Sequence, residues 1–140
     1  WIAVRGEFAL FPIFLMLILM LWMGGFDIIY ATQDEEIDRQ MGLHSVPARF
    51  GRNKALKIAL GSHLAMLGLC LVFGIYWKMG MAWWLVFSLM TIAIAYIHLF
   101  RKSDDLDSLN RDFFLANVGI SFLVMVGLFV WILTGGTAFG

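Results

Sequence analysis

The sequence predicts an all-α integral membrane protein, a helical bundle with four transmembrane helices. Composition is the first reason: 61% of the 140 residues are hydrophobic, 14% are charged, and the mean hydropathy is +0.85. Soluble domains average roughly 45–50% apolar and about 25% charged residues, so lipid must cover part of this surface. Length is the second reason, because four apolar segments approach the ~20 residues that a spanning helix needs. These segments do not alternate in polarity as barrel strands would.

Each apolar segment is expected to be one spanning helix, because a helix satisfies its own backbone groups in lipid. The first covers about residues 8–30 and holds one charged residue, Asp27. The other three contain no Lys, Arg, Asp or Glu and cover about 58–77, 82–100 and 113–134. The connections are a long polar loop, a tight turn and a short charged loop, at 31–57, 78–81 and 101–112.

Charge predicts the orientation of this multi-pass protein. The loops 31–57 and 101–112 hold eight of the ten basic residues. Lys and Arg favour the cytoplasmic side, so both loops are expected there. The expected location is a bacterial inner (plasma) membrane. The net charge of zero argues against a nucleic-acid partner.

Acidic residues also gather after the first apolar segment, and orientation does not explain them. If the first helix continues through Asp38, its 100° per residue places Asp27, Tyr30, Asp34 and Asp38 on one face. Like charges one turn apart repel, and a cation held by Asp34 and Asp38 would remove that cost. Mg²⁺ suits such a pair, since it binds one or two carboxylates and completes its shell with water and phosphate oxygens.

Basic residues follow the carboxylates closely, at Arg39, Arg49, Arg52 and Lys54. Together the two charge types predict a site for a metal-bound polyphosphate, with the bases taking the remaining phosphate oxygens. The histidines are scattered, which argues against zinc. A solvated juxtamembrane loop is the competing interpretation. Asp27 favours a site, because an ionisable residue within a span usually faces the bundle interior or a water-filled cavity, unless it reaches the interface from a helix end.

The stretch "GFDIIYATQDEEIDRQMGLHSVPARFG" resembles the second aspartate-rich motif of the UbiA family of membrane prenyltransferases. It is most similar to the 4-hydroxybenzoate polyprenyltransferase branch and the related enzymes of menaquinone synthesis. The segment "NRDFFLANVGISFLV" fits the same resemblance. The matching positions are Asp27, Tyr30, Ala31, Asp34, Asp38, Arg39, Gly42, Ser45, Pro47, Phe50 and Gly51.

This resemblance implies that residues 1–140 form a partial domain, the last four helices of a nine-helix fold. The family's first aspartate-rich motif, of the form N-D-x-x-D, is absent from the chain. The chain is therefore expected to be a fragment or one part of a split enzyme, and to be inactive alone.

The resemblance also implies a reaction. A polyprenyl group would pass from an isoprenoid diphosphate to an aromatic acceptor such as 4-hydroxybenzoate, in ubiquinone or menaquinone biosynthesis. Asp34 and Asp38 would hold Mg²⁺, and Tyr30 would shelter the allylic cation, with Asp27 in support. The residues expected to bind the diphosphate are Arg39, Arg52 and Lys54.

Other functions remain open at this point. CDP-alcohol phosphotransferases also use aspartates and Mg²⁺, but their D-G-x-x-A-R motif does not match Asp27 followed by Ile-Ile-Tyr. A small membrane transporter or a structural membrane subunit would need polar side chains within the spans, and few are present. Of these, His63 is expected to form an interhelical hydrogen bond, and His98 to lie near a helix end.

Overall fold

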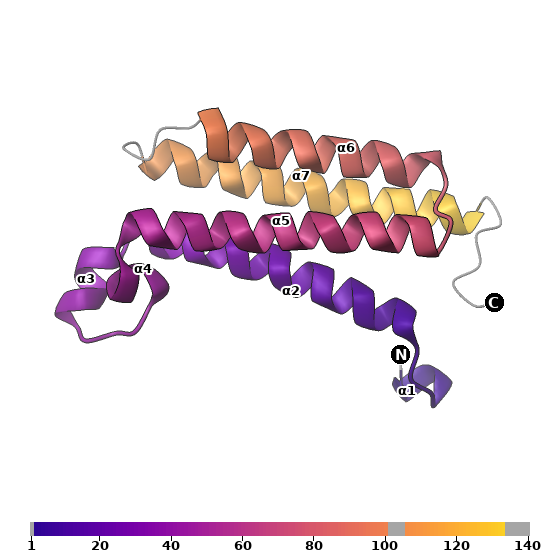
Figure 1. The fold of residues 1–140 in the computed structure, drawn as a ribbon, viewed down its shortest axis with the longest axis horizontal. Helices are drawn as coiled ribbons and strands as arrows, with labels where there is room; N and C mark the ends of the chain where they lie inside the picture. The colour runs from indigo at the N-terminus through magenta and orange to yellow at the C-terminus, as the bar shows by residue number, and fades with distance from the viewer. Residues whose placement is uncertain (1, 101–105, 134–140) are drawn as a thin grey trace.

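The computed structural model describes residues 2–100 and 106–133, and every regular element in these residues is a helix (Figure 1). In chain order the elements are α1 (Ile2–Arg5), α2 (Leu10–Ala31), α3 (Glu35–Gln40), α4 (Val46–Phe50), α5 (Arg52–Tyr76), α6 (Met81–Ala95), the π-helical turn η1 (Tyr96–Phe100) and α7 (Leu106–Leu133).

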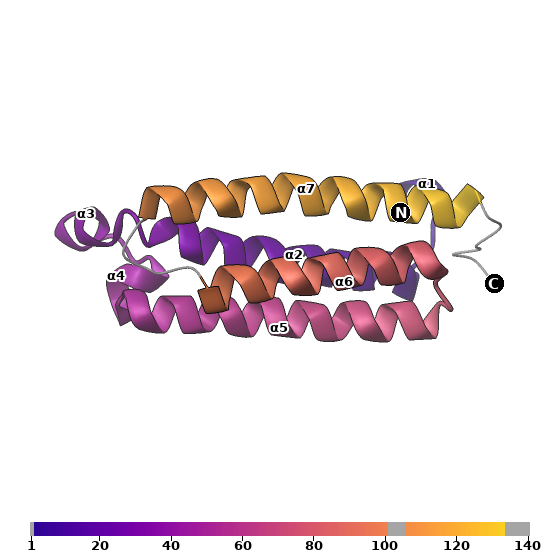
Figure 2. The same ribbon diagram turned by 90° about the horizontal axis from the view of Figure 1, so that it is seen from above.

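The four long helices confirm the predicted all-α membrane bundle. Helices long and apolar enough to cross a membrane cover Leu10–Ala31, Arg52–Tyr76, Met81–Leu99 and Phe114–Leu133. They run alongside one another in two perpendicular views, with α3 and α4 at one end of the bundle and α1 at the other (Figures 1 and 2). The charged motif therefore lies at one membrane surface, next to the end of the first span.

The polar loop contains more helix than the sequence predicted. Helices α3 and α4 lie within 31–57, and α5 begins at Arg52, whereas the apolar segment begins near residue 58. In the same way, α7 begins at Leu106, inside the expected loop 101–112. Hydropathy marks the part of a helix that lies in lipid, and a helix continues into water when its first turns are charged. Ser45 caps α4, because its side chain accepts a hydrogen bond from the Ala48 amide at 3.3 Å.

Aromatic side chains form the core at the end of the bundle away from the motif. Phe11 of α2 lies with ring centroids 5.1 Å from Phe73 of α5 and 6.0 Å from Trp131 of α7. Trp83 of α6 is buried against Gly74, where a Cβ atom would lie 2.6 Å from the indole nitrogen. Large rings of this kind contribute most of the apolar contact in a core.

A layer of polar contacts joins the four spans nearer to the motif. The Ser62 hydroxyl donates to the Leu21 carbonyl at 2.7 Å, which links α5 to α2. The Trp22 indole N–H donates to the Asn117 side-chain oxygen at 2.6 Å, which links α2 to α7. Buried polar groups in a membrane need such partners, so these contacts determine how the helices are placed.

The same layer contains a histidine pair. Nδ1 of His63 on α5 lies 3.0 Å from Nε2 of His98 on η1. His63 also lies against Gly25 of α2, where a Cβ atom would be only 2.6 Å from its Nε2. Glycine therefore allows α2 to approach α5 closely, two residues before Asp27.

Candidate active site

Helix α2 ends just before the aspartate pair, so the expectation of one helix continuing through Asp38 is wrong. The amides of Thr32, Gln33 and Asp34 donate to the carbonyls three residues earlier, at 3.1, 3.1 and 3.2 Å. The buried Thr32 hydroxyl also donates to the Ile29 carbonyl at 2.6 Å. These shorter-range bonds tighten the last turn of α2. A Thr hydroxyl can bond to a carbonyl at the end of a helix in place of the next backbone amide, and so end the helix there.

The spacing of the two aspartates survives this break. Asp34 is the N-cap residue of α3, and the Asp38 amide donates to the Asp34 carbonyl at 2.7 Å. The two residues are therefore one helical turn apart, as the sequence predicted. Asp34 is exposed and Asp38 is half-buried.

Asp27 and Tyr30 lie on the outer face of α2. Both are exposed, Tyr30 by 55%, whereas Gly25 and Ile29 on the inner face are buried towards α5. The expectation that Asp27 faces the interior of the bundle is not met by the helices that the structure describes. A charged side chain in a span is costly in lipid, so this outer face must meet water or protein.

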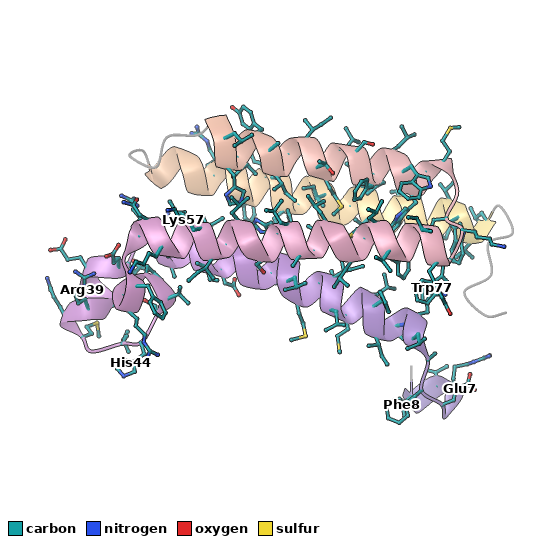
Figure 3. The ribbon with its side chains drawn as sticks, in the orientation of Figure 1. Glu7, Phe8, Arg39, His44, Lys57 and Trp77 are labelled. Carbon is teal, nitrogen blue, oxygen red and sulfur yellow. The ribbon has the colours of Figure 1, made fainter. Side chains whose placement is uncertain are left out.

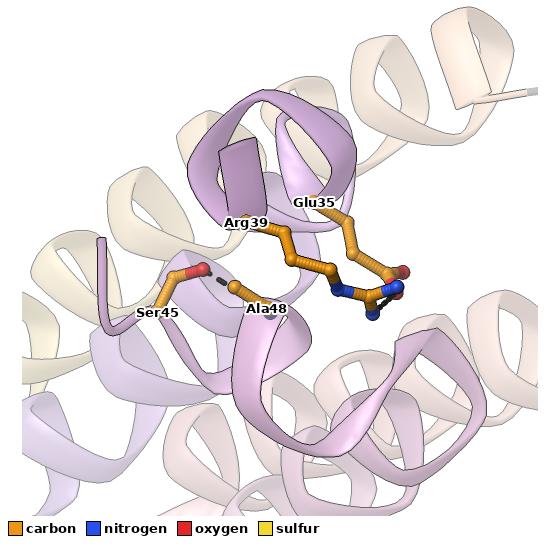
Figure 4. A network of polar contacts seen from close by, with 4 residues as sticks. All are labelled: Glu35, Arg39, Ser45 and Ala48. Atoms are coloured by element: carbon orange, nitrogen blue, oxygen red, sulfur yellow. Dashed lines mark hydrogen bonds and ion pairs between the residues drawn. The ribbon is translucent and has the colours of Figure 1, made fainter. Parts of the chain in front are cut away.

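Arg39 lies on α3, and Arg52 is the first residue of α5. Arg39 Nη2 bonds to Glu35 Oε1 at 2.7 Å, an i, i+4 ion pair on the helix surface (Figure 4). Arg39 projects about 100° from Asp38 around the helix axis. The structure therefore does not bring these two arginines into direct contact with the aspartate pair.

A polar pocket of about 470 Å³ lies between α3 and the start of α5 and is lined by Arg39 and Arg52, but not by Asp34 or Asp38. Glu35 and Glu36 line the same pocket. Nε and Nη2 of Arg52 are buried and have no hydrogen-bond partner among the described residues. Two unpaired guanidinium donors can bind an oxyanion in bidentate fashion. Lys54, also expected at the diphosphate, is exposed on the first turn of α5.

A second pocket, of about 510 Å³, lies between α3 and α4 and contains a residue to which the sequence assigned no role. Arg39, His44 and Arg49 line it together, and the Arg49 guanidinium lies 5.3 Å from the centroid of the Phe50 ring. His44 and Arg39 are labelled on this projecting part of the molecule in Figure 3. The position of His44 in the sequence does not indicate a functional role. His44 reaches the pocket only because α3 and α4 fold against each other.

The aspartate pair is the candidate ligand set for a magnesium ion. Over 2–100 and 106–133, no three His, Cys, Asp or Glu side chains gather closely enough to hold a metal ion. Two carboxylates one turn apart suffice for Mg²⁺ when phosphate oxygens and water complete the shell. Asp34 and Asp38 are therefore the residues that fit it.

The histidines of the spans belong to helix packing. His63 forms the interhelical contact that the sequence predicted, and its partner is His98 on the π-helical turn. The sequence marked both residues separately, but nothing in their spacing paired them. His98 and Asn117 likewise contact side chains of neighbouring helices.

Comparison with known proteins supports one family. The model of the UbiA prenyltransferase family matches residues 1–118, which include the whole motif from Asp27 to Gly51 and the first three spans. No curated protein and no solved structure matches the chain. With this match over most of its length, and with four apolar spanning helices, the chain belongs to the UbiA family, a family of membrane prenyltransferases that act on isoprenoid diphosphates and aromatic substrates.

Proposed function

We propose that this protein takes part in the Mg²⁺-dependent transfer of a polyprenyl group to an aromatic acceptor such as 4-hydroxybenzoate, in ubiquinone or menaquinone biosynthesis. The donor is a polyprenyl diphosphate. The reaction takes place at the cytoplasmic face of a bacterial inner membrane, the side on which the basic loops are expected. Family membership supports prenyl transfer, and the motif sequence supports this branch of the family.

The aspartate pair is the observation that carries this proposal. Asp34 and Asp38 stay one turn apart, joined through the Asp38 amide and the Asp34 carbonyl, although the helix before them ends. They lie where the first span leaves the membrane, next to the exposed Asp27 and Tyr30. When bound, Mg²⁺ would screen the charge that develops on the departing diphosphate.

Arg52 provides support for diphosphate binding. Its Nε and Nη2 atoms are buried without partners among the described residues, and a buried donor left unpaired is destabilising. A phosphate oxygen in the neighbouring pocket would satisfy them. Arg39 lines the same pocket and can exchange Glu35 for phosphate, and Lys54 adds an exposed charge on the adjacent turn.

Tyr30 is the proposed shelter for the allylic cation. It is exposed on the outer face of α2, one turn from Asp27 and at the end of the span nearest the aspartates. The face of a Tyr ring attracts a cation, and the attraction is stronger when water is excluded. The acceptor ring then attacks the cation and releases its ring proton to water or to the departed diphosphate. Asp27 supports the position of Tyr30 and of the polar groups around it.

A complete site would need further protein packed over the outer face of α2. Asp27 lies on a membrane-spanning face that no described helix covers. We propose that further transmembrane segments with a second set of carboxylates, of the N-D-x-x-D form, face it. On this proposal the 140 residues are part of a larger site and are inactive alone.

A transfer assay on membranes that contain the full polypeptide tests this function. Radiolabelled polyprenyl diphosphate and 4-hydroxybenzoate are supplied with Mg²⁺, and both free diphosphate and prenylated acceptor are measured. We expect both products in equal amounts, and neither after EDTA treatment. Release of diphosphate without prenylated acceptor would contradict the acceptor class, and full activity in EDTA would contradict the role of the metal.

A further inference from the structure

A notch opens between the third and fourth spans, at the end of the bundle that holds the motif. Its volume is about 380 Å³, within the range of roughly 300–1,000 Å³ that is typical of small-ligand sites. Each span contributes three residues with i, i+3, i+4 spacing, which places them on one helix face. We call this pocket the α6–α7 notch, and it is lined by Ala93, Tyr96, Ile97, Asp112, Leu115 and Ala116.

The α6–α7 notch is a local feature of two helices that lie side by side in both views (Figures 1 and 2). Towards the other end of the pair, a Cβ atom at Gly127 would lie 3.1 Å from Cγ2 of Val86, so the helices are closely packed there. At the notch the small residues are Ala93 and Ala116. Both are half-buried and pack against the core, and their single methyl groups leave the space above them open.

A carboxylate gives the notch its charge. Asp112 lines it, and 20% of the Asp112 side chain is exposed. Nε of Arg111 lies 4.0 Å from Oδ1 of Asp112, a long ion pair, and the Arg111 side chain is 70% exposed. Successive residues of a helix point about 100° apart, so Arg111 lies beside the notch while Asp112 lies in it. The mouth of the notch therefore offers a negative charge with a positive charge next to it.

These charges lie at the depth of the lipid head groups. The fourth span covers Phe114–Leu133, which begins two residues after Asp112, and the third span covers Met81–Leu99 and ends three residues after Tyr96. Tyr is common at this depth, where its ring meets lipid and its hydroxyl meets water, and Tyr96 is 50% exposed. The rest of the lining is apolar. A ligand that fits has a charged head and an apolar chain, as a membrane lipid does.

We propose that the α6–α7 notch binds a phospholipid whose head group carries a primary ammonium, such as phosphatidylethanolamine. The ammonium donates to the Asp112 carboxylate, the phosphate lies near the Arg111 guanidinium, and an acyl chain lies along Leu115 and Ala93. The bound lipid holds α6 to α7 at this end and touches neither the prenyl donor nor the acceptor, so its role is separate from prenyl transfer.

The charges around the notch favour this head group over the other common ones. The N–H groups of a primary ammonium can hydrogen-bond to a carboxylate, whereas the methyl groups of choline cannot, and bonds between charged partners are the stronger ones. A head group that is only anionic would be repelled by Asp112. Anionic lipids are usually bound by clusters of basic residues, but residues 101–112 hold four Asp against three Lys and Arg.

Lipid binding to the full polypeptide tests the choice of head group. The purified protein in detergent is titrated with phosphatidylethanolamine, phosphatidylcholine or phosphatidylglycerol of the same acyl chains, and bound lipids are resolved by native mass spectrometry. We expect phosphatidylethanolamine to bind about tenfold more tightly than either of the others, as one hydrogen bond to a charged group allows. Equal binding of the three lipids, or a preference for phosphatidylglycerol, would overturn the proposal.

A pair of variants tests whether Asp112 makes that choice. Asp112→Asn keeps the size of the side chain and removes its charge. We expect the preference for phosphatidylethanolamine to disappear in Asp112→Asn, while the affinity for phosphatidylcholine stays the same. Glu7→Gln removes an exposed carboxylate at the other end of the bundle and should keep the full preference. A preference that persists in Asp112→Asn, or that is lost equally in Glu7→Gln, would overturn the proposal.

Photolabelling locates the bound lipid. Phosphatidylethanolamine with a diazirine in the acyl chain, close to the head group, is irradiated with the full polypeptide, and labelled peptides are identified by mass spectrometry. We expect label within residues 93–97 and 112–116, reduced about tenfold in Asp112→Asn at subsaturating lipid. Label only on other segments would show that the lipid binds elsewhere, or that another helix covers the notch, and would overturn the proposal. Neither readout depends on prenyl transfer.

Discussion

The two faces of α2 treat polar residues in opposite ways. On the inner face, the Leu21 carbonyl and Trp22 bond to neighbouring spans, and Gly25 packs against His63. On the outer face, Asp27 and Tyr30 are exposed, with no described helix packed over them. Polar groups that have partners within the bundle stabilise it, whereas Asp27 and Tyr30 are the groups proposed to meet substrate. The comparison separates residues that join α2 to its neighbours from residues that are proposed to form the site.

The largest effect is expected on the outer side, at the aspartate pair. Asp34→Asn and Asp38→Asn each keep the size of the side chain but remove a charge that would hold the metal. We expect transfer to fall by about 10²–10³-fold in each variant, as when one charge-stabilising group is lost. Initial rates at several Mg²⁺ concentrations measure this loss. Glu7→Gln, at the other end of the bundle, is the matched control, and near-normal activity in Asp34→Asn would contradict the site.

On the inner side, the close approach at Gly25 is the most sensitive position. In Gly25→Ala the new Cβ would lie 2.6 Å from His63 Nε2 and 3.2 Å from the Ala59 carbonyl. Overpacking of this kind costs about 1–3 kcal/mol, and the helix shift would also move Asp27. Thermal unfolding in detergent measures the loss. Gly24→Ala is the control, because a Cβ there meets nothing within 4 Å, and equal stability of the two variants would contradict the packing.

The Trp22–Asn117 hydrogen bond is expected to have a smaller effect. A double-mutant cycle with Trp22→Phe and Asn117→Leu isolates the contact made at 2.6 Å. Hydrogen bonds between membrane helices average ~0.6 kcal/mol and reach about 1.7 kcal/mol. We expect a coupling energy in that range in the unfolding free energy, with little change in transfer rate. A coupling energy of zero would show that the contact does not hold α2 to α7.

The smallest change in stability is expected at the exposed Arg39–Glu35 pair. Surface i, i+4 pairs contribute about 0.3–0.5 kcal/mol and are weakened by salt. Glu35→Gln should therefore hardly change unfolding, and by freeing Arg39 it should lower the KM for the diphosphate donor. Arg39→Gln should raise that KM. Equal donor KM values in both variants would remove Arg39 from the diphosphate site.

The sequence was sufficient to predict the four membrane spans, because the hydropathy and length of a segment report directly on its burial in lipid. The spacing of Asp34 and Asp38 was also readable, since it depends on a single turn of helix. The end of α2 was not, because it depends on the Thr32 hydroxyl closing onto the Ile29 carbonyl. Competition between a side-chain hydroxyl and a backbone amide for one carbonyl does not change the hydropathy profile.

The relations between helices were beyond the sequence for a different reason. Arg52 is the first residue of α5, and the direction of α5 relative to α3 depends on how α4 turns the chain. His63 and His98 are 35 residues apart, and their contact depends on how α5 and η1 pack together. Residue types could identify these side chains as candidates, but only the fold shows which of them meet.

The π-helical turn at Tyr96–Phe100 has a consequence for how this protein tolerates insertions and deletions. A π turn bonds each residue to the fifth one along and so accommodates one residue more than an α turn. Deleting a single residue there would leave the hydropathy profile of the third span almost unchanged. It would nevertheless convert the π turn into an α turn and change the direction of the His98 side chain relative to His63. Length variants at this turn should therefore insert into membranes normally yet fail to lock the third span against the second.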